Sequence, residues 1–236
     1  MLSFLFPPIC PLCAKELLDK GERVCKSCRK KQIFIKEPTC YSCGKPMKNH
    51  EKEYCSDCRQ HPKNFERGMG LCIYQKPVTD SLAAIKYKNE RKFAQYYLEE
   101  IQKRKYRDLL QLKVDVIIPV PIHRKKRRKR GFNQAEIFAK GIAEMLNKPM
   151  YTKIVERIHD TKPQKQLNPG ERKSNLKKAF RGNLKEYQRA GMPKRVLLVD
   201  DIYTTGSTAE AVTAALKQLG IREVYVFCIA IGKGFS

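Results

Sequence analysis

The sequence predicts an α/β protein in which a parallel sheet flanked by helices follows a small, cysteine-rich N-terminal domain. From about residue 64 onward, apolar segments of strand length alternate with amphipathic helical segments. This alternation is typical of a parallel sheet covered on both faces. Before that point, eight of the ten cysteines lie within the first 58 residues. We therefore expect two domains, at residues 1–62 and 63–236.

The N-terminal cysteines form four C-x-x-C pairs separated by equal gaps of eleven residues. The pairs are Cys10/Cys13, Cys25/Cys28, Cys40/Cys43 and Cys55/Cys58. A C-x-x-C turn directs two thiolates at one ion, and the opening residues do not form a secretory signal peptide. The spacing therefore predicts two structural Zn²⁺ ions rather than disulfides, so residues 1–62 are expected to form a double zinc ribbon. Tandem and cross-braced pairing are both open, and we favour tandem pairing because local closure costs less loop entropy.

The second domain is expected to begin with a strand at 71–74 and helices at about 78–88 and 91–104. A buried strand at 114–118 precedes a helix from about Asn133, where Asn133 and Glu136 resemble a capping box. The remaining expected elements are a polar connection at 157–178, a strand at 195–199, a helix ending at Gly220 and a strand at 224–231. Cys72 and Cys228 are expected in the core.

The chain is strongly basic, with 49 Lys and Arg against 24 Asp and Glu and a formal net charge of +25. Residues 1–67 carry +6 and the remainder +19, so the excess is not confined to one domain. Such an excess favours nucleic-acid binding. No apolar run reaches the roughly 20 residues that cross a bilayer, so we expect no membrane span. Cysteines used as zinc ligands rather than in disulfides imply the cytoplasm.

Seven consecutive basic residues, Arg124–Arg130, concentrate this charge. Three interpretations are open: a solvated surface loop, a nuclear-localisation signal, or a phosphate-binding track for nucleic acid. His123 precedes the run and is the one histidine worth testing. Tyr41 and Tyr54 lie near the cysteine pairs, where they could stack on bases or simply contribute to packing.

The stretch from Val196 to Thr208 predicts a sugar-phosphate site. Its apolar strand leads into two adjacent carboxylates and then into a hydroxyl-rich turn at the start of a helix. Ligands of open α/β sheets bind at the carboxyl ends of strands, and a helix N-terminus attracts phosphate. The candidate residues are Asp200, Asp201, Thr204, Thr205, Gly206, Ser207 and Thr208. The simpler alternative is an N-capped helix beside solvated acids.

This stretch resembles the 5-phosphoribosyl-1-pyrophosphate (PRPP) motif of type I phosphoribosyltransferases. The resemblance implies a phosphoribosyltransferase-like sheet in which Asp200 and Asp201 bind ribose hydroxyls and residues 204–208 bind the 5′-phosphate. It also implies Mg²⁺ bound together with PRPP. The position of residues 157–178 matches the mobile lid of these enzymes, although a plain surface connection fits as well.

A second pattern narrows the resemblance. Ile118-Pro119-Val120-Pro121, the basic run and Gly131-Phe132-Asn133-Gln134 are together similar to the ComF/ComFC competence protein family, in which the C-x-x-C array also occurs. In phosphoribosyltransferases the loop after this strand holds pyrophosphate. The candidates for pyrophosphate or DNA phosphate are Lys86, Arg124, Lys125, Arg127, Arg128 and Arg130.

The family resemblance implies a cytoplasmic protein of natural transformation that binds imported single-stranded DNA. It also implies an ATP-driven DNA translocase and other competence proteins as partners, which would bring the protein to the inner face of the membrane. Two other functions stay open. An active phosphoribosyltransferase of nucleotide or base salvage would release pyrophosphate from PRPP. A zinc-dependent adaptor would lose a protein complex, but not DNA affinity, when Cys10 or Cys40 is replaced.

Overall fold

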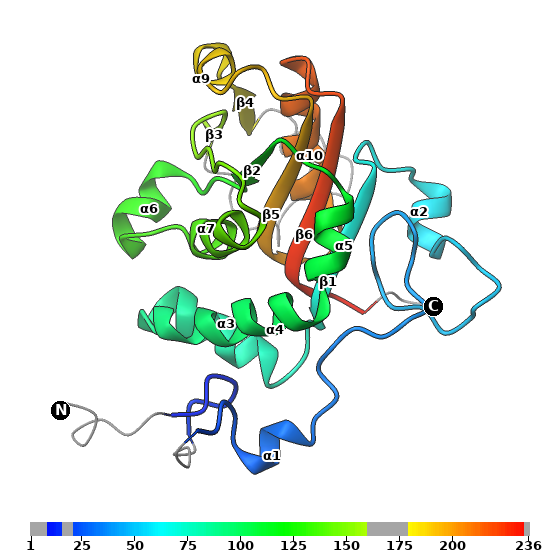
Figure 1. The fold of residues 1–236 in the computed structure, drawn as a ribbon, viewed down its shortest axis with the longest axis vertical. Coiled ribbons are helices and arrows are strands. Elements are labelled where there is room, and N and C mark those ends of the chain that lie inside the picture. Colours follow the sequence, from blue (N-terminus) through cyan, green and yellow to red (C-terminus); the bar gives the residue numbers. More distant parts are fainter. Residues whose placement is uncertain (1–8, 16–20, 160–178, 234–236) are drawn as a thin grey trace.

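The centre of the protein is a four-stranded parallel sheet with the order β1-β6-β5-β2 (Figure 1). The computed structural model describes residues 9–15, 21–159 and 179–233. The strands of this sheet are β1 (Arg67–Ile73), β2 (Val116–Pro119), β5 (Arg195–Tyr203) and β6 (Glu223–Ile231). All three neighbouring pairs run parallel. The expected parallel sheet flanked by helices is therefore confirmed.

Helices cover both faces of the sheet. The helical elements of the α/β part are α3 (Val78–Lys88), the 3₁₀ turn η1 (Arg91–Phe93), α4 (Ala94–Arg104), α5 (Tyr106–Gln111), α6 (Arg124–Arg130), α7 (Gln134–Leu146), α9 (Leu184–Arg189) and α10 (Ser207–Gln218). Leu197 and Val199 point into one apolar cluster with α3, α4 and α7, whereas Val196 and Leu198 point into another with α10. This alternation is what the period-2 side-chain geometry of a strand produces. Cys72 and Cys228 are buried, as expected.

A small antiparallel pair, β3 (Val155–Arg157) and β4 (Phe180–Gly182), lies beside the main sheet. The polar connection expected at 157–178 begins at the end of β3. Residues 160–178, to which the lid interpretation applies, lie outside the described residues.

The basic run forms a helix, α6, which does not fit the first of its three interpretations, a solvated surface loop. Lys and Arg are favourable helix formers, and two flanking residues terminate the helix well. The Nδ1 atom of His123 accepts a hydrogen bond from the Lys125 N–H at 3.3 Å, and Gly131 ends the helix with a φ of +81°. No residue of α6 is buried. A charged segment without a buried residue lacks the apolar periodicity from which helices are predicted, so no pattern in the sequence indicated this helix.

Two further expectations are corrected in detail. Strand β5 continues through Asp200 and Asp201 to Tyr203, because its pairing with β6 extends to Tyr203 and Ile231. At the start of α7, Asn133 Oδ1 accepts the Ala135 N–H at 3.2 Å, as a capping residue should. Glu136, however, forms an ion pair with Arg127 instead of completing a capping box.

The cysteine-rich region packs on the sheet domain at two separate places (Figure 1). The first ribbon contains α1 (Lys26–Arg29) and lies beside α3, where the Ser81 hydroxyl donates to the carbonyl oxygen of Pro11. The second ribbon contains α2 (Ser56–Gln60) and lies beside β1. None of the helices among the described residues is long and apolar enough to cross a membrane.

The second ribbon meets β1 backbone to backbone. The Gly68 N–H donates to the carbonyl oxygen of Ser42 at 2.6 Å. A Cβ added to Gly68 would lie 2.9 Å from the Cys43 oxygen, and one added to Gly44 would lie 2.6 Å from the Gly68 oxygen. Glycine is therefore required on both sides of this contact. The ribbon and the strand consequently have little freedom to separate without disturbing β1.

Candidate metal centres and phosphate site

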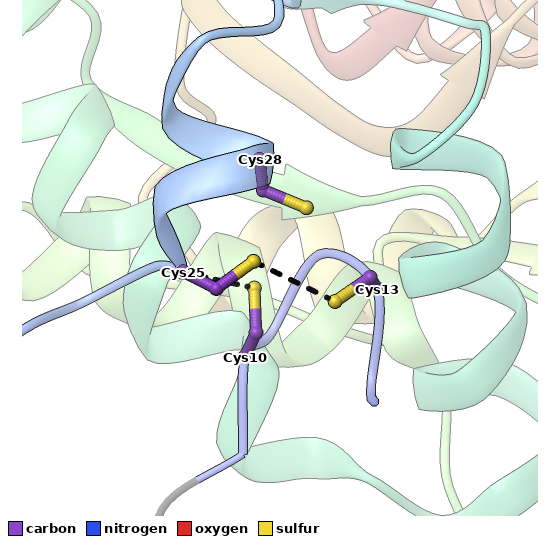
Figure 2. Close-up of side chains that lie close together, drawn as sticks. All are labelled: Cys10, Cys13, Cys25 and Cys28. Atoms are coloured by element: carbon purple, nitrogen blue, oxygen red, sulfur yellow. Dashed lines mark hydrogen bonds between the residues drawn. The ribbon is translucent and has the colours of Figure 1, made fainter. Parts of the chain in front are cut away.

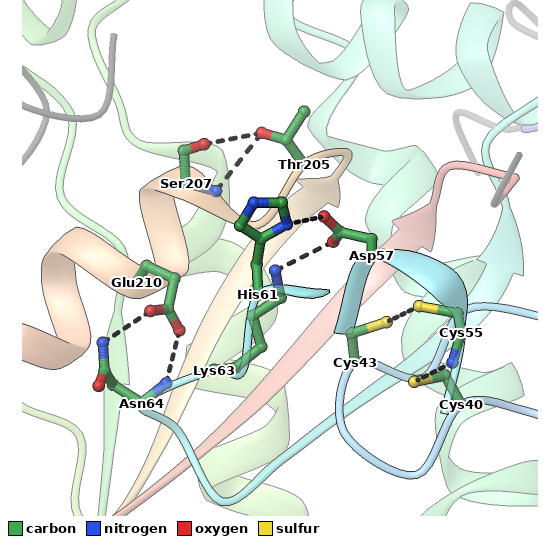
Figure 3. Close-up of polar contacts among 10 residues, drawn as sticks. All are labelled: Cys40, Cys43, Cys55, Asp57, His61, Lys63, Asn64, Thr205, Ser207 and Glu210. Atoms are coloured by element: carbon green, nitrogen blue, oxygen red, sulfur yellow. Dashed lines mark hydrogen bonds and ion pairs between the residues drawn. The ribbon is translucent and has the colours of Figure 1, made fainter. Parts of the chain in front are cut away.

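The eight N-terminal cysteines form two four-cysteine clusters in tandem. In each cluster the four sulfur atoms lie within 4.8 Å of one another. The first cluster is Cys10, Cys13, Cys25 and Cys28 (Figure 2). The second is Cys40, Cys43, Cys55 and Cys58, of which Figure 3 draws the first three. The structure thus forms the tandem pairing that loop entropy favours over the cross-braced one.

The sulfur geometry fits tetrahedral zinc. Zn–S bonds of about 2.3 Å place two sulfurs of a tetrahedral site about 3.8 Å apart. The Cys13 and Cys25 sulfurs are 3.9 Å apart, and the Cys43 and Cys55 sulfurs are 3.7 Å apart. A bound zinc ion would cross-link the two turns of each ribbon, and four thiolates are its usual ligands in structural sites.

Equivalent backbone contacts support the thiolates of the two clusters. The Cys25 N–H points at the Cys10 sulfur at 3.5 Å, and the Cys55 N–H at the Cys40 sulfur at 3.3 Å. Cys25 and Cys55 are also the N-cap residues of α1 and α2. The sequence repeat is therefore a structural repeat, in which each second C-x-x-C pair begins a short helix.

At the carboxyl end of the sheet, the predicted carboxylates lie on the last part of β5. Asp201 is 5% exposed, and its Oδ2 accepts a hydrogen bond from the Lys86 ammonium of α3 at 3.1 Å. The Asp200 carboxylate accepts the Asp201 N–H at 2.8 Å. The structure thus brings Lys86, predicted from a distant part of the sequence, into contact with the acidic pair.

Asp200 has an unusual electrostatic environment. Burial raises the pKa of its carboxyl well above the ordinary value of 3.8, and the neighbouring Asp201 charge raises it further. The Lys86 charge acts in the opposite direction on the same pKa. Because the folded protein raises this pKa, the ionised form of Asp200 lowers the stability of the ligand-free fold. Perturbed carboxyl groups of this kind are concentrated at functional sites.

We expect Asp200→Asn to raise the melting temperature at pH 7. The unfolded carboxyl ionises near its ordinary pKa of 3.8, whereas the folded one has a higher pKa. Stability is therefore lost as the pH rises from about 4 through the folded-state pKa, and the penalty is absent at lower pH. Thermal unfolding of both proteins from pH 3 to pH 8 measures this difference. The exposed Asp80→Asn serves as control, and a lower melting temperature for Asp200→Asn at pH 7 would contradict the expectation.

The hydroxyl-rich turn between β5 and α10 has the form of a phosphate cradle. Gly206 turns the chain with a φ of +80°, and α10 begins at Ser207. The Thr205 and Ser207 hydroxyl oxygens are 2.9 Å apart, and Thr204 and Thr205 are exposed. The first N–H groups of a helix lack partners within the helix, so the turn offers backbone and hydroxyl donors to one anion. The turn comprises Thr204, Thr205, Gly206, Ser207 and Thr208.

The helical form of the basic run divides its side chains between two cavities. A cavity of 360 Å³ between α3 and α6 is lined by Lys86, Tyr87, Asn89, Lys126, Lys129, Arg130 and Phe132. Arg124 and Arg127, with His123, instead line a cavity of 320 Å³ that reaches β3. Lys125 and Arg128 line neither of these two. Of the predicted phosphate ligands, Lys86 and Arg130 therefore share one cavity, and Arg124 and Arg127 share the other.

Sequence reasoning missed four residues at these sites. Lys126 and Lys129 share a face of α6 with Arg130, which their helical spacing would have indicated if the run had been expected to be a helix. Tyr87 is 74% exposed, and the Arg130 guanidinium lies 5.3 Å from its ring centroid. Lys45 belongs to the second ribbon and lies against the ring of Tyr203. No sequence pattern indicates this contact.

The tyrosines of the second ribbon form a small exposed cluster. Tyr41 and Tyr54 meet edge to face with ring centroids 6.1 Å apart. The Arg67 guanidinium lies 5.3 Å from the Tyr41 centroid, and Tyr41 is 57% exposed. The two rings pack against each other and still leave one face open to solvent.

The chain is similar to several known proteins. A family model described as the double zinc ribbon domain matches residues 1–59. Competence protein F of Haemophilus influenzae is 32% identical over 161 residues, which cover 66% of this chain and 69% of that protein. DNA utilization protein YhgH of Salmonella typhimurium is 32% identical over 58% of this chain and 57% of its own length. Competence protein ComFC of Bacillus subtilis is 29% identical over 44% of this chain and 39% of its own length.

Among solved structures, a purine phosphoribosyltransferase from Pyrococcus horikoshii matches 57% of this chain and 72% of its own chain. The two are 25% identical in the matched region, with a TM-score of 0.35.

Proposed function

The chain belongs to the competence protein F family, and from that premise we propose that it binds single-stranded DNA during DNA uptake and carries a PRPP-type phosphoribosyl site. The names of its relatives, competence protein and DNA utilization protein, support a role in the handling of DNA. Under this proposal the protein acts in the cytoplasm in natural transformation. Its partners there would be an ATP-driven DNA translocase and other competence proteins.

The observation that carries the DNA-binding proposal is the cavity between α3 and α6. Four cationic residues line it together with the exposed ring of Tyr87; they are Lys86, Lys126, Lys129 and Arg130. Proteins that bind single strands without strong sequence preference combine cations along the backbone with aromatic rings on which bases stack. A second ring, that of Phe132, lines the same cavity and has the Arg91 guanidinium 4.2 Å from its centroid.

The phosphoribosyl site is proposed at the adjacent carboxyl end of β5. Its support is the combination of two carboxylates for ribose hydroxyls with the Gly206 turn for the 5′-phosphate. The Asp200 carboxylate has acceptor capacity beyond its bond from the Asp201 N–H, and carboxylate oxygen is a ligand that Mg²⁺ accepts. We therefore expect Mg²⁺ to enter together with PRPP. Lys86 lines the cationic cavity and pairs with Asp201, so the two sites share a residue.

The proposal is tested by titrating the zinc-loaded protein into labelled single-stranded DNA by fluorescence anisotropy. The titration is repeated at several salt concentrations, with and without Mg²⁺-PRPP. Binding that persists near 0.15 M salt and prefers single strands over duplex supports the DNA role. Competition by PRPP would couple the two sites through Lys86. Binding that vanishes by about 0.15 M salt without strand preference would instead be nonspecific attraction by charge.

Neutralising one face of α6 should weaken DNA binding and flatten its salt dependence. Each lost phosphate contact on a single strand reduces the slope of log K against log salt by about 0.7. The triple variant Lys126→Gln, Lys129→Gln and Arg130→Gln is therefore expected to lower that slope by about 2. The matched control is Lys185→Gln, Lys194→Gln and Arg222→Gln.

The control removes the same number of positive charges from exposed positions. Lys194 and Arg222 immediately precede β5 and β6, so they lie at the end of the sheet opposite to the proposed phosphoribosyl site. Equal losses of slope in the two triple variants would show that total charge, and not the α3–α6 cavity, determines DNA affinity.

An active phosphoribosyltransferase is the second candidate, favoured by the acidic pair and the Gly206 turn at one strand end. The 320 Å³ cavity between α6 and β3 is within the size range of small-molecule sites and could take an acceptor. Pyrophosphate release from PRPP in the presence of nucleobases tests it. Release that depends on Asp200 and Asp201 would establish an enzyme, and its absence with every base would leave PRPP as a bound ligand.

A further inference from the structure

A cavity of 450 Å³ separates the second zinc ribbon from the Gly206 turn, and we call it the ribbon cavity. The ribbon contributes Lys45 and Asp57 to its lining, and the carboxyl end of the sheet contributes Thr204, Thr205 and Lys233. A metal-binding segment near the N-terminus and the proposed phosphate turn thus face the same space. Figure 3 shows Asp57 of the ribbon near the turn that carries Thr205 and Ser207.

Lys45 is a largely buried residue whose ammonium reaches the ribbon cavity and has no carboxylate of the described residues in contact. The residue is only 9% exposed, and its ammonium lies 6.0 Å from the ring centroid of Tyr203. Among the described residues, no carboxylate lies within ion-pair distance of the Lys45 ammonium and no side chain or carbonyl accepts a hydrogen bond from it. Burying a charged group is costly unless it is paired. An anion in the ribbon cavity would supply the missing partner.

The acidic residue of the lining, Asp57, is already engaged elsewhere. Its carboxylate accepts a hydrogen bond from the Lys63 ammonium at 3.0 Å and lies 3.6 Å from Nδ1 of His61 (Figure 3). Lys233 adds a second cation to the lining, so the ribbon cavity favours a negatively charged occupant.

The two walls of the ribbon cavity are held together by several contacts. Asn64, which links the second ribbon to β1, donates its N–H and its side-chain amide to the Glu210 carboxylate at 2.9 and 2.8 Å. Phe65 meets the Tyr203 ring edge to face at 6.4 Å. Tyr203 in turn lies under Gly206, where an added Cβ would be 2.2 Å from its hydroxyl oxygen. The ribbon therefore cannot shift without moving the turn.

We propose that the ribbon cavity is a phosphate-binding subsite in which Lys45, Lys233 and the hydroxyls of Thr204 and Thr205 hold one phosphate group. The proposal rests on the phosphoribosyl and DNA-binding function proposed above, and it makes the second ribbon a direct part of that ligand site. The phosphate belongs either to a ribose 5-phosphate moiety or to the backbone of a DNA strand. The same four donors would serve both sources.

Zinc in the second ribbon is then linked to ligand binding. Lys45 lies two residues after Cys43, and its carbonyl oxygen accepts the Cys40 N–H at 2.8 Å. The position of Lys45 therefore depends on the turn that the metal closes. Coupling between two binding events is reciprocal, so a bound phosphate should also raise the zinc affinity of this ribbon.

The test compares zinc-loaded wild type with Lys45→Met and with Lys48→Met, an exposed lysine of the same ribbon. Isothermal titration measures ribose 5-phosphate, and anisotropy measures single-stranded DNA. Loss of a charge-assisted bond predicts affinity about tenfold lower for Lys45→Met and unchanged affinity for Lys48→Met. A loss confined to one ligand identifies that ligand as the source of the phosphate. Lys233→Met is a second variant, outside the second ribbon in the sequence, and is expected to weaken binding of the same ligand.

Unchanged affinity of Lys45→Met and Lys233→Met for both ligands would overturn the subsite while leaving the proposed function intact. Failure of the wild type to bind either ligand would overturn both. Zinc release to a chelator, followed with and without ribose 5-phosphate, provides an independent readout. A higher chelator concentration needed to remove one of the two zinc equivalents when ribose 5-phosphate is bound supports the linkage. If Lys45→Met merely accelerates zinc loss and its zinc-saturated form binds ligand normally, Lys45 only balances the thiolate charge and the subsite is wrong.

Discussion

Replacing Cys43 with serine is expected to remove one of two zinc ions and to abolish phosphate binding at the Gly206 turn. Structural zinc sites in small ribbons contribute about 10–16 kcal/mol of apparent binding free energy, which is comparable to the whole stability of an ordinary domain. Cys40, Cys43 and Cys58 are buried in the same apolar cluster as Tyr203 and Ala209. Losing the second zinc should therefore loosen the turn that precedes α10, and not only the ribbon.

Cys28→Ser provides the matched control, because it removes the same kind of ligand from the first ribbon. That ribbon packs with α3 and α4 in the other apolar cluster, away from Tyr203. Both variants should bind one zinc per chain by elemental analysis and melt at lower temperature. The Cys43 variant alone should lose ribose 5-phosphate affinity. Two zinc ions bound by either variant would refute the assignment of its thiolate as a zinc ligand. Equal losses of ribose 5-phosphate affinity in both variants would refute the claim that the second ribbon, rather than the first, supports the Gly206 turn.

Gly206→Ala is expected to disrupt the phosphate turn itself. The residue has a φ of +80°, and its Cβ would lie 2.2 Å from the hydroxyl oxygen of Tyr203 and 2.6 Å from Cζ of that ring. A left-handed backbone costs a non-glycine residue about 1–2 kcal/mol, and the clash with a buried ring adds to it. We expect lower thermal stability and more than tenfold weaker binding of ribose 5-phosphate, because the ring and the turn cannot both keep their positions.

Two controls separate the clash from the backbone cost. Gly191 has a φ of +77°, but an added Cβ there has no atom within 4 Å, so Gly191→Ala should show the backbone cost alone. Tyr203→Phe removes a buried hydroxyl that has no hydrogen-bond partner among the described residues and should be nearly neutral. In the double variant with Gly206→Ala, Tyr203→Phe should restore part of the thermal stability that Gly206→Ala alone removes. If the Gly206 and Gly191 variants have equal stabilities and ligand affinities, the turn does not need a close approach to Tyr203.

Much of the fold could be predicted from local patterns. The alternation of apolar strands and amphipathic helices predicted the parallel sheet, since buried strands and half-buried helices have different periods. No pattern predicted α6, because its seven basic residues have no apolar face and its helix depends on propensity and on the caps His123 and Gly131. The end of β5 was also missed, because the pairing of Tyr203 with Ile231 is set by a partner strand and not by composition.

Some residues of the candidate sites could likewise be predicted from the sequence, and others could be assigned only from the structure. The sequence predicted the C-x-x-C repeat and the acidic pair with its glycine turn, because the chemistry of both depends on fixed spacing along the chain. Lys86 was predicted only through resemblance, and the structure added its contact with Asp201. Tyr87, Lys126 and Lys129 could be assigned to one cavity only after α3 and α6 had been positioned in space.

By itself the sequence determined which groups this protein has available: eight thiolates, two adjacent carboxylates, a hydroxyl-rich turn and an excess of cations. Those features follow from residue type and short-range spacing, which covalent geometry largely dictates. Only the tertiary structure decided which of them meet. It set the second ribbon against the Gly206 turn, buried Lys45 in the cavity between them and separated the first ribbon from both. Such contacts join residues more than a hundred positions apart, and packing and hydrogen bonding across that distance leave no periodic trace in a single chain.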